Sequence, residues 1–193
     1  IYVDGIYSDK HADIERTLIK HIPTLTKARR AEVISYLDLI AKNTNLSDTN
    51  YIACANGLLN IDTLELEEFT PNYVCKNKIA VSYNPAATGD ILDHTLDKIS
   101  CNNDKLRRII EEMIGYCLLR RNELGKSFIL TGVGSNGKST ILDIIKELIG
   151  EDNISSLGMN ELGTRFKTAE LYGKMVNVGD DISNSYIDDN SIF

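Results

Sequence analysis

Residues 131–140 read TGVGSNGKST, and this glycine-rich segment limits the possible folds more than any other feature of the chain. Its last glycine is followed directly by Lys138 and Ser139, in the spacing Gly-x-x-x-x-Gly-Lys-Ser. An apolar run at 127–131 precedes the loop, and an amphipathic run at 141–150 follows it. A strand, a glycine loop and a helix in this order are typical of a phosphate-binding loop. The alternative is a flexible turn that carries a surface lysine.

The residue types in this loop suit the binding of nucleotide phosphates. Gly132, Gly134 and Gly137 leave room for a phosphate to approach successive backbone N–H groups, which form an anion-binding nest. The helix expected next adds the positive end of its dipole. Lys138 supplies positive charge to the β- and γ-phosphates, and the hydroxyl of Ser139 is a ligand for Mg²⁺. The predicted ATP-binding residues are Gly132, Val133, Gly134, Ser135, Asn136, Gly137, Lys138, Ser139 and Thr140.

A second strand with an acidic end is expected to complete the site. Residues 171–181 read LYGKMVNVGDD, in which an apolar stretch ends at Asp180 and Asp181. Magnesium needs a carboxylate near the phosphates, and hydrolysis needs a group that orients the attacking water. We therefore predict that Asp180 and Ser139 hold Mg²⁺. Asp181 and Lys138 are the predicted catalytic residues. A polar turn after a strand is the alternative interpretation of the acidic pair.

Periodicity and turn signals divide the chain into four predicted parts. A hydrophobic stripe at helical spacing predicts a helix over 104–121, and Asn56-Gly57 between apolar runs predicts an antiparallel hairpin. The parts are a helical lead-in (1–45), a small antiparallel β-containing domain (46–95), a helical linker (96–126) and the first part of a P-loop ATPase domain (127–193). The predicted fold class is an α/β P-loop NTPase core preceded by a small mixed α+β and helical domain.

Weaker local patterns predict further elements. Asp4-Gly5 between apolar residues predicts a short hairpin at the start of the chain. Helices are expected over 12–21 and 27–42. The strands predicted in the ATPase part are 127–131, 153–157 and 175–179.

Composition limits the classes of partner. The net charge of −7 argues against general, charge-driven binding of nucleic acid. No run approaches the ~18 apolar residues that cross a bilayer, so we expect no membrane partner and a cytoplasmic location. The first residues lack an initiator Met, which suggests a piece cut from a longer chain. Four separated cysteines are expected to be buried free thiols rather than metal ligands. They are Cys54, Cys75, Cys101 and Cys117.

Two motifs together resemble a known family. The loop GVGSNGKST at 132–140 and the phrase ELYGKMVNVGDD at 170–181 resemble the superfamily 3 helicases of phages, plasmids and large DNA viruses, the poxvirus-type primase–helicase group. Residues 171–174 match the Leu-x-Gly-Lys phrase of that family. Upstream, residues 55–85 resemble the domain that precedes the ATPase in these proteins.

This resemblance implies an AAA+-like helicase core that uses ATP and Mg²⁺. It also implies a hexameric ring that translocates on single-stranded DNA, so the expected partners are single-stranded DNA and further copies of the chain. Asp181 stands where many relatives carry Glu, which shortens the predicted base. The family's DNA-contacting hairpin, sensor asparagine and arginine finger would follow Phe193. We therefore expect an incomplete core that alone binds nucleotide weakly if at all, hydrolyses it negligibly and does not unwind DNA.

Two rival functions remain open from the sequence. A P-loop small-molecule kinase shares the glycine loop, but such enzymes usually begin near that loop, whereas 131 residues precede Gly132 here. A replication-assembly or origin-binding module would use nucleotide only to stabilise an oligomer, without hydrolysis. Stimulation of ATP hydrolysis by single-stranded DNA would distinguish the motor from both.

Overall fold

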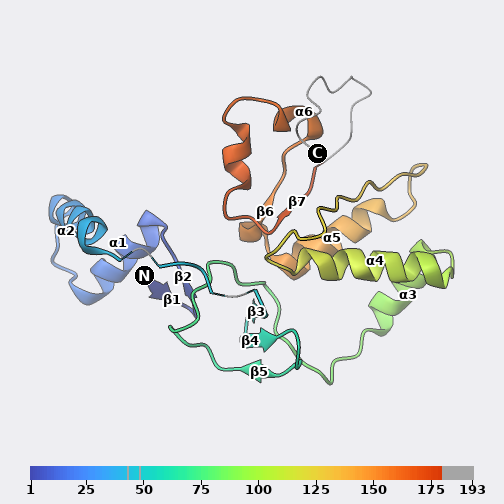
Figure 1. Ribbon diagram of the computed structural model, residues 1–193, viewed down its shortest axis with the longest axis horizontal. Helices are drawn as coiled ribbons and strands as arrows, with labels where there is room; N and C mark the ends of the chain where they lie inside the picture. Colours follow the sequence, from blue (N-terminus) through green and yellow to red (C-terminus); the bar gives the residue numbers. More distant parts are fainter. Residues whose placement is uncertain (43, 48, 180–193) are drawn as a thin grey trace.

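A short hairpin opens the chain in the computed structural model (Figure 1). The structure describes residues 1–42, 44–47 and 49–179. Strands β1 (Tyr2–Val3) and β2 (Ile6–Tyr7) pair antiparallel. Between them, Asp4 and Gly5 have φ angles of 50° and 85°, the left-handed conformation that a tight hairpin turn requires. This hairpin confirms the prediction from Asp4-Gly5.

Two helices follow the hairpin and lie apart from the later helices (Figure 1). They are α1 (His11–His21) and α2 (Lys27–Ile40). The second begins after Thr26, whose side-chain oxygen accepts a hydrogen bond from the backbone N–H of Arg29. An ion pair between Arg30 and Glu15 joins the two helices. Both helices agree with the predicted ranges to within two residues.

A three-stranded antiparallel sheet follows, with strand order β3-β4-β5. The strands are β3 (Tyr51–Cys54), β4 (Gly57–Asn60) and β5 (Leu66–Glu67). Cys54 pairs with Gly57, so the predicted hairpin is present and its two turn residues are Ala55 and Asn56. Residues 78–83 run beside β3 without forming a regular strand. The N–H of Ile79 donates to the carbonyl of Ala53 at 2.8 Å.

Three further helices follow the sheet. They are α3 (Asp90–Ile99), α4 (Asp104–Cys117) and α5 (Lys138–Ile149). The structure ends α4 at Cys117, before the predicted position 121, because the N–H groups of the next residues bond three positions back rather than four. Helix α3 spans position 95, where the sequence suggested a domain boundary.

One apolar core joins these helices to the sheet. Along α5, Ile141, Ile145 and Ile149 recur every four residues and are all buried. They belong to a single cluster that also contains residues of α3, α4 and the β3–β4 hairpin: Leu96, Ile110, Met113, Cys54 and Leu59. The helix that follows the glycine loop therefore packs against residues from before and after position 95, the suggested domain boundary.

Beyond α5 the chain forms a small parallel pair of strands. These are β6 (Ile154–Ser155) and β7 (Val176–Asn177). Short helical segments surround β6 in the sequence: η1 (Glu151–Asn153) before it, then α6 (Met159–Leu162) and η2 (Lys167–Leu171). Both strands lie inside the predicted ranges 153–157 and 175–179, which confirms those two predictions.

The strand predicted over 127–131 is wrong. The structure describes this segment and assigns no strand to it. Phe128 and Ile129 are 45% and 63% exposed, and Leu130 packs against the core. An apolar run forms a strand only where a neighbouring strand offers hydrogen-bond partners, and the sequence window contains no information about that neighbour.

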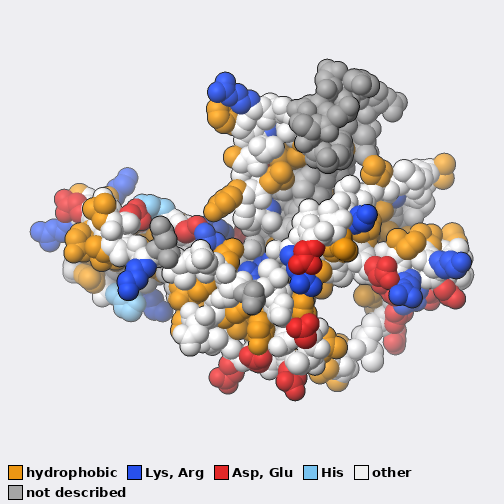
Figure 2. All heavy atoms as spheres, viewed as in Figure 1, with side chains coloured by type: hydrophobic (Ala, Val, Ile, Leu, Met, Phe, Trp, Pro, Cys, Tyr) orange, Lys and Arg blue, Asp and Glu red, His pale blue; other side chains and the backbone are white. Residues whose placement is uncertain are grey.

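Charged side chains gather where α3 and α4 meet (Figure 2). Arg107 of α4 forms ion pairs with Asp93 and Asp97 of α3 and with Glu111 on its own helix. These carboxylates raise the pKa of Arg107, with Asp97 making the largest contribution.

Among the described residues, no helix combines the length and apolar character needed to span a bilayer.

Candidate nucleotide-binding site

The glycine loop turns into α5 through a residue that must be glycine. Gly137 caps the helix with a φ of 86°. A Cβ at this position would lie 2.6 Å from Cγ1 of Ile99, which is too close for any side chain. Gly134, by contrast, has open space around the position of a Cβ. The glycine at 137 is therefore a steric requirement of the fold, whereas the glycine at 134 is not.

Lys138 folds back over the loop that precedes it. Its Nζ atom donates to the carbonyl oxygens of Gly132 and Val133, at 3.1 Å and 3.3 Å. It also donates to Oδ1 of Asn136 at 2.9 Å. The loop carbonyls and the amide of Asn136 thus hold the ammonium group over the loop. This places a positive charge next to the first turn of α5.

Unused hydrogen-bond donors lie beside this ammonium group. Among the described residues, the backbone N–H groups of 133–137 find no protein acceptor. The first N–H groups of α5 are also unpaired, as at any helix start, and the positive end of the helix dipole lies there. Free backbone N–H groups and a nearby cation at a helix start are the kind of donors that a polyphosphate can use.

The loop and the helix start enclose a small pocket of about 270 Å³. Its lining comes from residues 135–140, which include the hydroxyl-bearing Ser139 and Thr140. The predicted phosphate-binding residues are therefore contiguous in space: six line the pocket, and Gly132 and Val133 contact Lys138. The donor set fits a phosphate chain, and Ser139 offers an oxygen of the kind that Mg²⁺ accepts as a ligand.

The two acidic residues predicted to complete the site, Asp180 and Asp181, lie outside the described residues. The chain is described as far as Gly179. Just before that point, the N–H of Val178 donates to the carbonyl of Ser155 at 2.8 Å, which continues the pairing of β7 with β6. The amide of Asn177 reinforces this pairing, because it accepts from the N–H of Leu157 and donates to its carbonyl.

Sequence reasoning missed helix α3 and its place beside the loop. A second hollow lies between the first turns of α3 and α5, and Thr140 lines both this hollow and the loop pocket. A signal was present in the sequence. Gly89-Asp90 precedes apolar residues at helical spacing, and Asp is favoured in the first turn of a helix.

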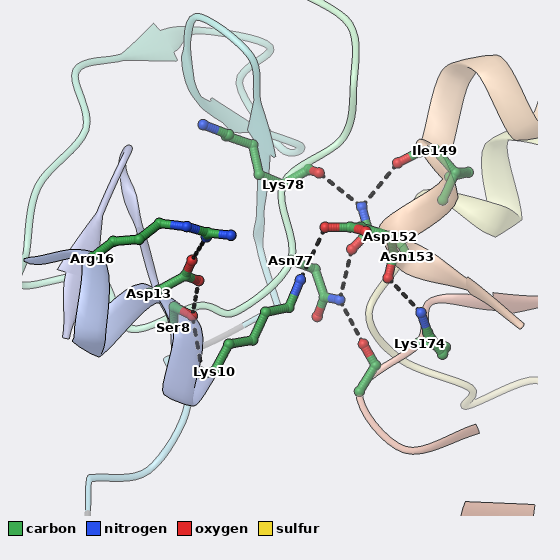
Figure 3. A network of polar contacts seen from close by, with 11 residues as sticks. Ser8, Lys10, Asp13, Arg16, Asn77, Lys78, Ile149, Asp152, Asn153 and Lys174 are labelled. Carbon is green, nitrogen blue, oxygen red and sulfur yellow. Dashed lines mark hydrogen bonds and ion pairs between the residues drawn. The ribbon is translucent and has the colours of Figure 1, made fainter. Parts of the chain in front are cut away.

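A polar network that no sequence pattern predicted also holds the far end of α5 in place (Figure 3). Asn153 is buried, and its Nδ2 donates to the carbonyls of Lys78 and Ile149 at 2.8 Å and 2.9 Å. Asn77 points toward it and bonds both Oδ1 of Asn153 and the carbonyl of Gly173. Nearby, the exposed Lys10 forms an ion pair with Asp152 at 2.9 Å, and Lys10 lowers the pKa of that carboxyl group. The segment around 77–78 is thereby attached to the region after the glycine loop.

Comparison with protein families divides the chain near the start of the glycine loop. Residues 130–192 match a family of unknown function, DUF5906. Residues 4–115, more than half of the chain, match the family described as D5 N terminal like. These matches are consistent with a phage or viral primase–helicase, although neither one identifies the superfamily 3 helicase core that the motifs resemble. The chain belongs to the D5 N terminal like family.

Proposed function

We propose that residues 127–193 are part of an α/β P-loop NTPase core whose loop at 132–140 binds ATP. The whole protein would be an AAA+-like superfamily 3 helicase of the phage or viral primase–helicase type. Its subunits would assemble into a ring and use ATP hydrolysis to translocate on single-stranded DNA. The match to the D5 N terminal like family upstream of the loop supports this placement.

One observation carries the proposal. Nζ of Lys138 lies over a loop whose N–H groups at 133–137 have no protein acceptor among the described residues. A simple surface turn would direct its lysine into solvent rather than back over the loop. A cation held over a loop with free N–H groups, at the start of a helix, instead favours a ligand with several negative oxygens.

The proposed roles follow from the position of each group. The loop N–H groups bind and orient the phosphates, and Lys138 would exchange its contacts with the loop carbonyls for phosphate oxygens. Ser139 would hold Mg²⁺, which when bound neutralises charge on the phosphates. Asp180 is proposed as the second holder of the metal. Asp181 is proposed as the group that accepts a hydrogen bond from the attacking water.

The first test is binding of Mg·ATP to the 193-residue chain, followed by thermal or urea unfolding. A ligand that binds only the folded state at about ten times its Kd stabilises it by about 1.4 kcal/mol. We expect stabilisation that rises with ligand concentration and is absent in Lys138→Ala. Lys146→Ala is the matched control, because Lys146 is exposed on the same helix, two turns from the loop. Equal stabilisation of wild type and Lys138→Ala would refute the assigned phosphate site.

A second candidate is a non-hydrolysing assembly module. The contacts of Asn153 with Asn77 and Lys78 favour it in one respect, because nucleotide at the start of α5 could stabilise the upstream part of the chain through that helix. The helicase motor hydrolyses ATP, whereas the assembly module does not. In the full-length parent protein, the motor predicts ATP hydrolysis stimulated by single-stranded DNA and lost in Lys138→Ala. DNA replication that proceeds normally with Lys138→Ala would favour the assembly module.

A further inference from the structure

The hollow beside the loop pocket lies between two helix starts. It has a volume of about 600 Å³, within the range of small-molecule sites. One wall is the first turns of α3, with Ile91, Leu92 and Thr95. The other wall is α5, with Thr140 and Ile144. The hollow therefore has two sides built on helices that share the main apolar core.

The α3 wall carries two apolar side chains that are open to solvent, beside the polar Asp90 and Thr95. Ile91 is 86% exposed and Leu92 is 42% exposed, whereas Leu96 on the same helix is buried in the core at 3%. Packing in the core thus buries Leu96, but it does not bury Ile91 and Leu92, which lie about one turn earlier on the helix. On the opposite side, Ile144 adds a further apolar side chain. A flat, weakly polar group inserted here would remove these side chains from water, which is favourable.

The position of the hollow relative to the loop selects the occupant. Thr140 lines both the hollow and the loop pocket, so the two spaces are adjacent at that residue. Ile144 follows Thr140 by four residues, which is about 6 Å along a helix. A ligand with its charged end at Lys138 would therefore reach the apolar walls with its other end. Nucleotides have this construction, because a ribose separates the phosphates from the base.

We propose that the hollow formed by Ile91, Leu92, Thr95, Thr140 and Ile144 binds the heteroaromatic base of the nucleotide. This inference rests on the proposed function, since it takes the phosphates to lie at the glycine loop. Apolar contact with both ring faces would contribute affinity without reading one base. The site thus discriminates a nucleoside triphosphate from inorganic polyphosphate.

The test compares ATP with inorganic tripolyphosphate, both with Mg²⁺, on the 193-residue chain. We expect Ile91→Gln to weaken ATP binding about tenfold, equivalent to about 1.4 kcal/mol, and to leave tripolyphosphate binding unchanged. Leu92→Gln should act in the same direction. Glutamine is uncharged, so repulsion of phosphate does not contribute, and it is a good helix former. Ile109→Gln is the matched control: Ile109 is an exposed isoleucine of α4 that does not line the hollow.

Failure of this inference is distinguishable from failure of the phosphate site. If wild type binds both ligands through Lys138 and Ile91→Gln binds ATP as wild type does, the base lies elsewhere and the phosphate site stands. If tripolyphosphate and ATP both fail to bind wild type, the proposed function is refuted, and the base subsite with it. Photolabelling with 8-azido-ATP gives an independent readout. Label in the peptides that contain 88–95 or 140–144 supports the assignment, and label confined to other peptides contradicts it.

Discussion

Nδ2 of Asn77 donates a hydrogen bond of 3.0 Å to Oδ1 of Asn153, across 76 positions of sequence. The amide of Asn153 has no unused donor, since its Nδ2 bonds the carbonyls of Lys78 and Ile149. Asn77 lies in the part of the chain that matches the D5 N terminal like family, and Asn153 follows the helix of the glycine loop. One buried amide therefore joins the end of α5 to the upstream region.

Replacing Asn153 should destabilise the fold. Asn153→Ala removes one acceptor and two donors, and leaves two carbonyls and the amide of Asn77 without those partners. The bond to the carbonyl of Ile149 is buried, and an unsatisfied buried group costs about 1–3 kcal/mol, so we expect a loss in this range. Urea unfolding followed by circular dichroism measures the change. Asn160→Ala in α6 is the control, because Asn160 is exposed. Equal stabilities for the two variants would contradict a structural role for the buried amide.

Gly134 and Gly137, two of the three glycines of the loop, should differ in their tolerance of alanine. At Gly137 a methyl group meets Cγ1 of Ile99 at 2.6 Å, and the φ of 86° is strained for alanine. A residue forced into such a conformation costs about 1–3 kcal/mol, so Gly137→Ala should lower the free energy of unfolding by at least that amount. Gly134→Ala should leave it within about 0.5 kcal/mol of wild type. A thermal unfolding series of both variants measures the difference, and the reverse order would show that the described loop conformation is incorrect.

The four cysteines should react with a thiol reagent in a defined order. Burial raises the pKa of the Cys54, Cys75 and Cys117 thiols, so their reactive thiolate fraction stays low near neutral pH and grows only as the pH rises. Cys101 is exposed, contrary to the expectation that all four thiols are buried. At about pH 8 we expect one fast-reacting thiol, removed by Cys101→Ser, and further reaction on unfolding. Fast labelling that persists in Cys101→Ser would contradict this order.

The ion pair between Lys76 and Asp9 should make a small, pH-dependent contribution to stability. The hydrogen bond from Lys76, at 2.6 Å, lowers the pKa of Asp9 from its ordinary value of 3.8. The folded state therefore gains stability above pH 3.8 and loses it as the pH falls through the lower folded pKa. Because the side chain of Asp9 is 68% exposed, the gain is at most about 1 kcal/mol.

Urea unfolding of Asp9→Asn tests this contribution. The variant should be less stable than wild type at about pH 7, and the difference should shrink at about pH 2.5 as Asp9 becomes protonated. Asp62→Asn, at an exposed aspartate before β5, serves as the comparison. A difference from wild type that is the same at both pH values would exclude the ion pair as its source.

Local patterns in the sequence were sufficient to predict several elements. The turn at Asp4-Gly5, helices α1 and α2, and the helix after Lys138 all follow from signals within one short window, such as a glycine, a cap or a hydrophobic stripe. The glycine loop also belongs to this class, because its residue spacing and the helix that follows it are contiguous in the sequence. The candidate phosphate site was therefore predictable as a set of residues.

Contacts between distant segments determined the features of the fold that local patterns did not predict. Residues 127–131 have the apolar character of a strand, yet pairing depends on a neighbour that no local window contains. The steric need for glycine at 137 comes from Ile99, and the sharing of Thr140 between two pockets comes from the packing of α3 beside α5. The bond between Asn77 and Asn153 exists only once the chain has folded. The sequence by itself thus determined which residues form the glycine loop and the helix after it, because backbone conformation there follows local chemistry. Only the tertiary structure determined what lies beside that site, because packing depends on residues that are far apart in the chain.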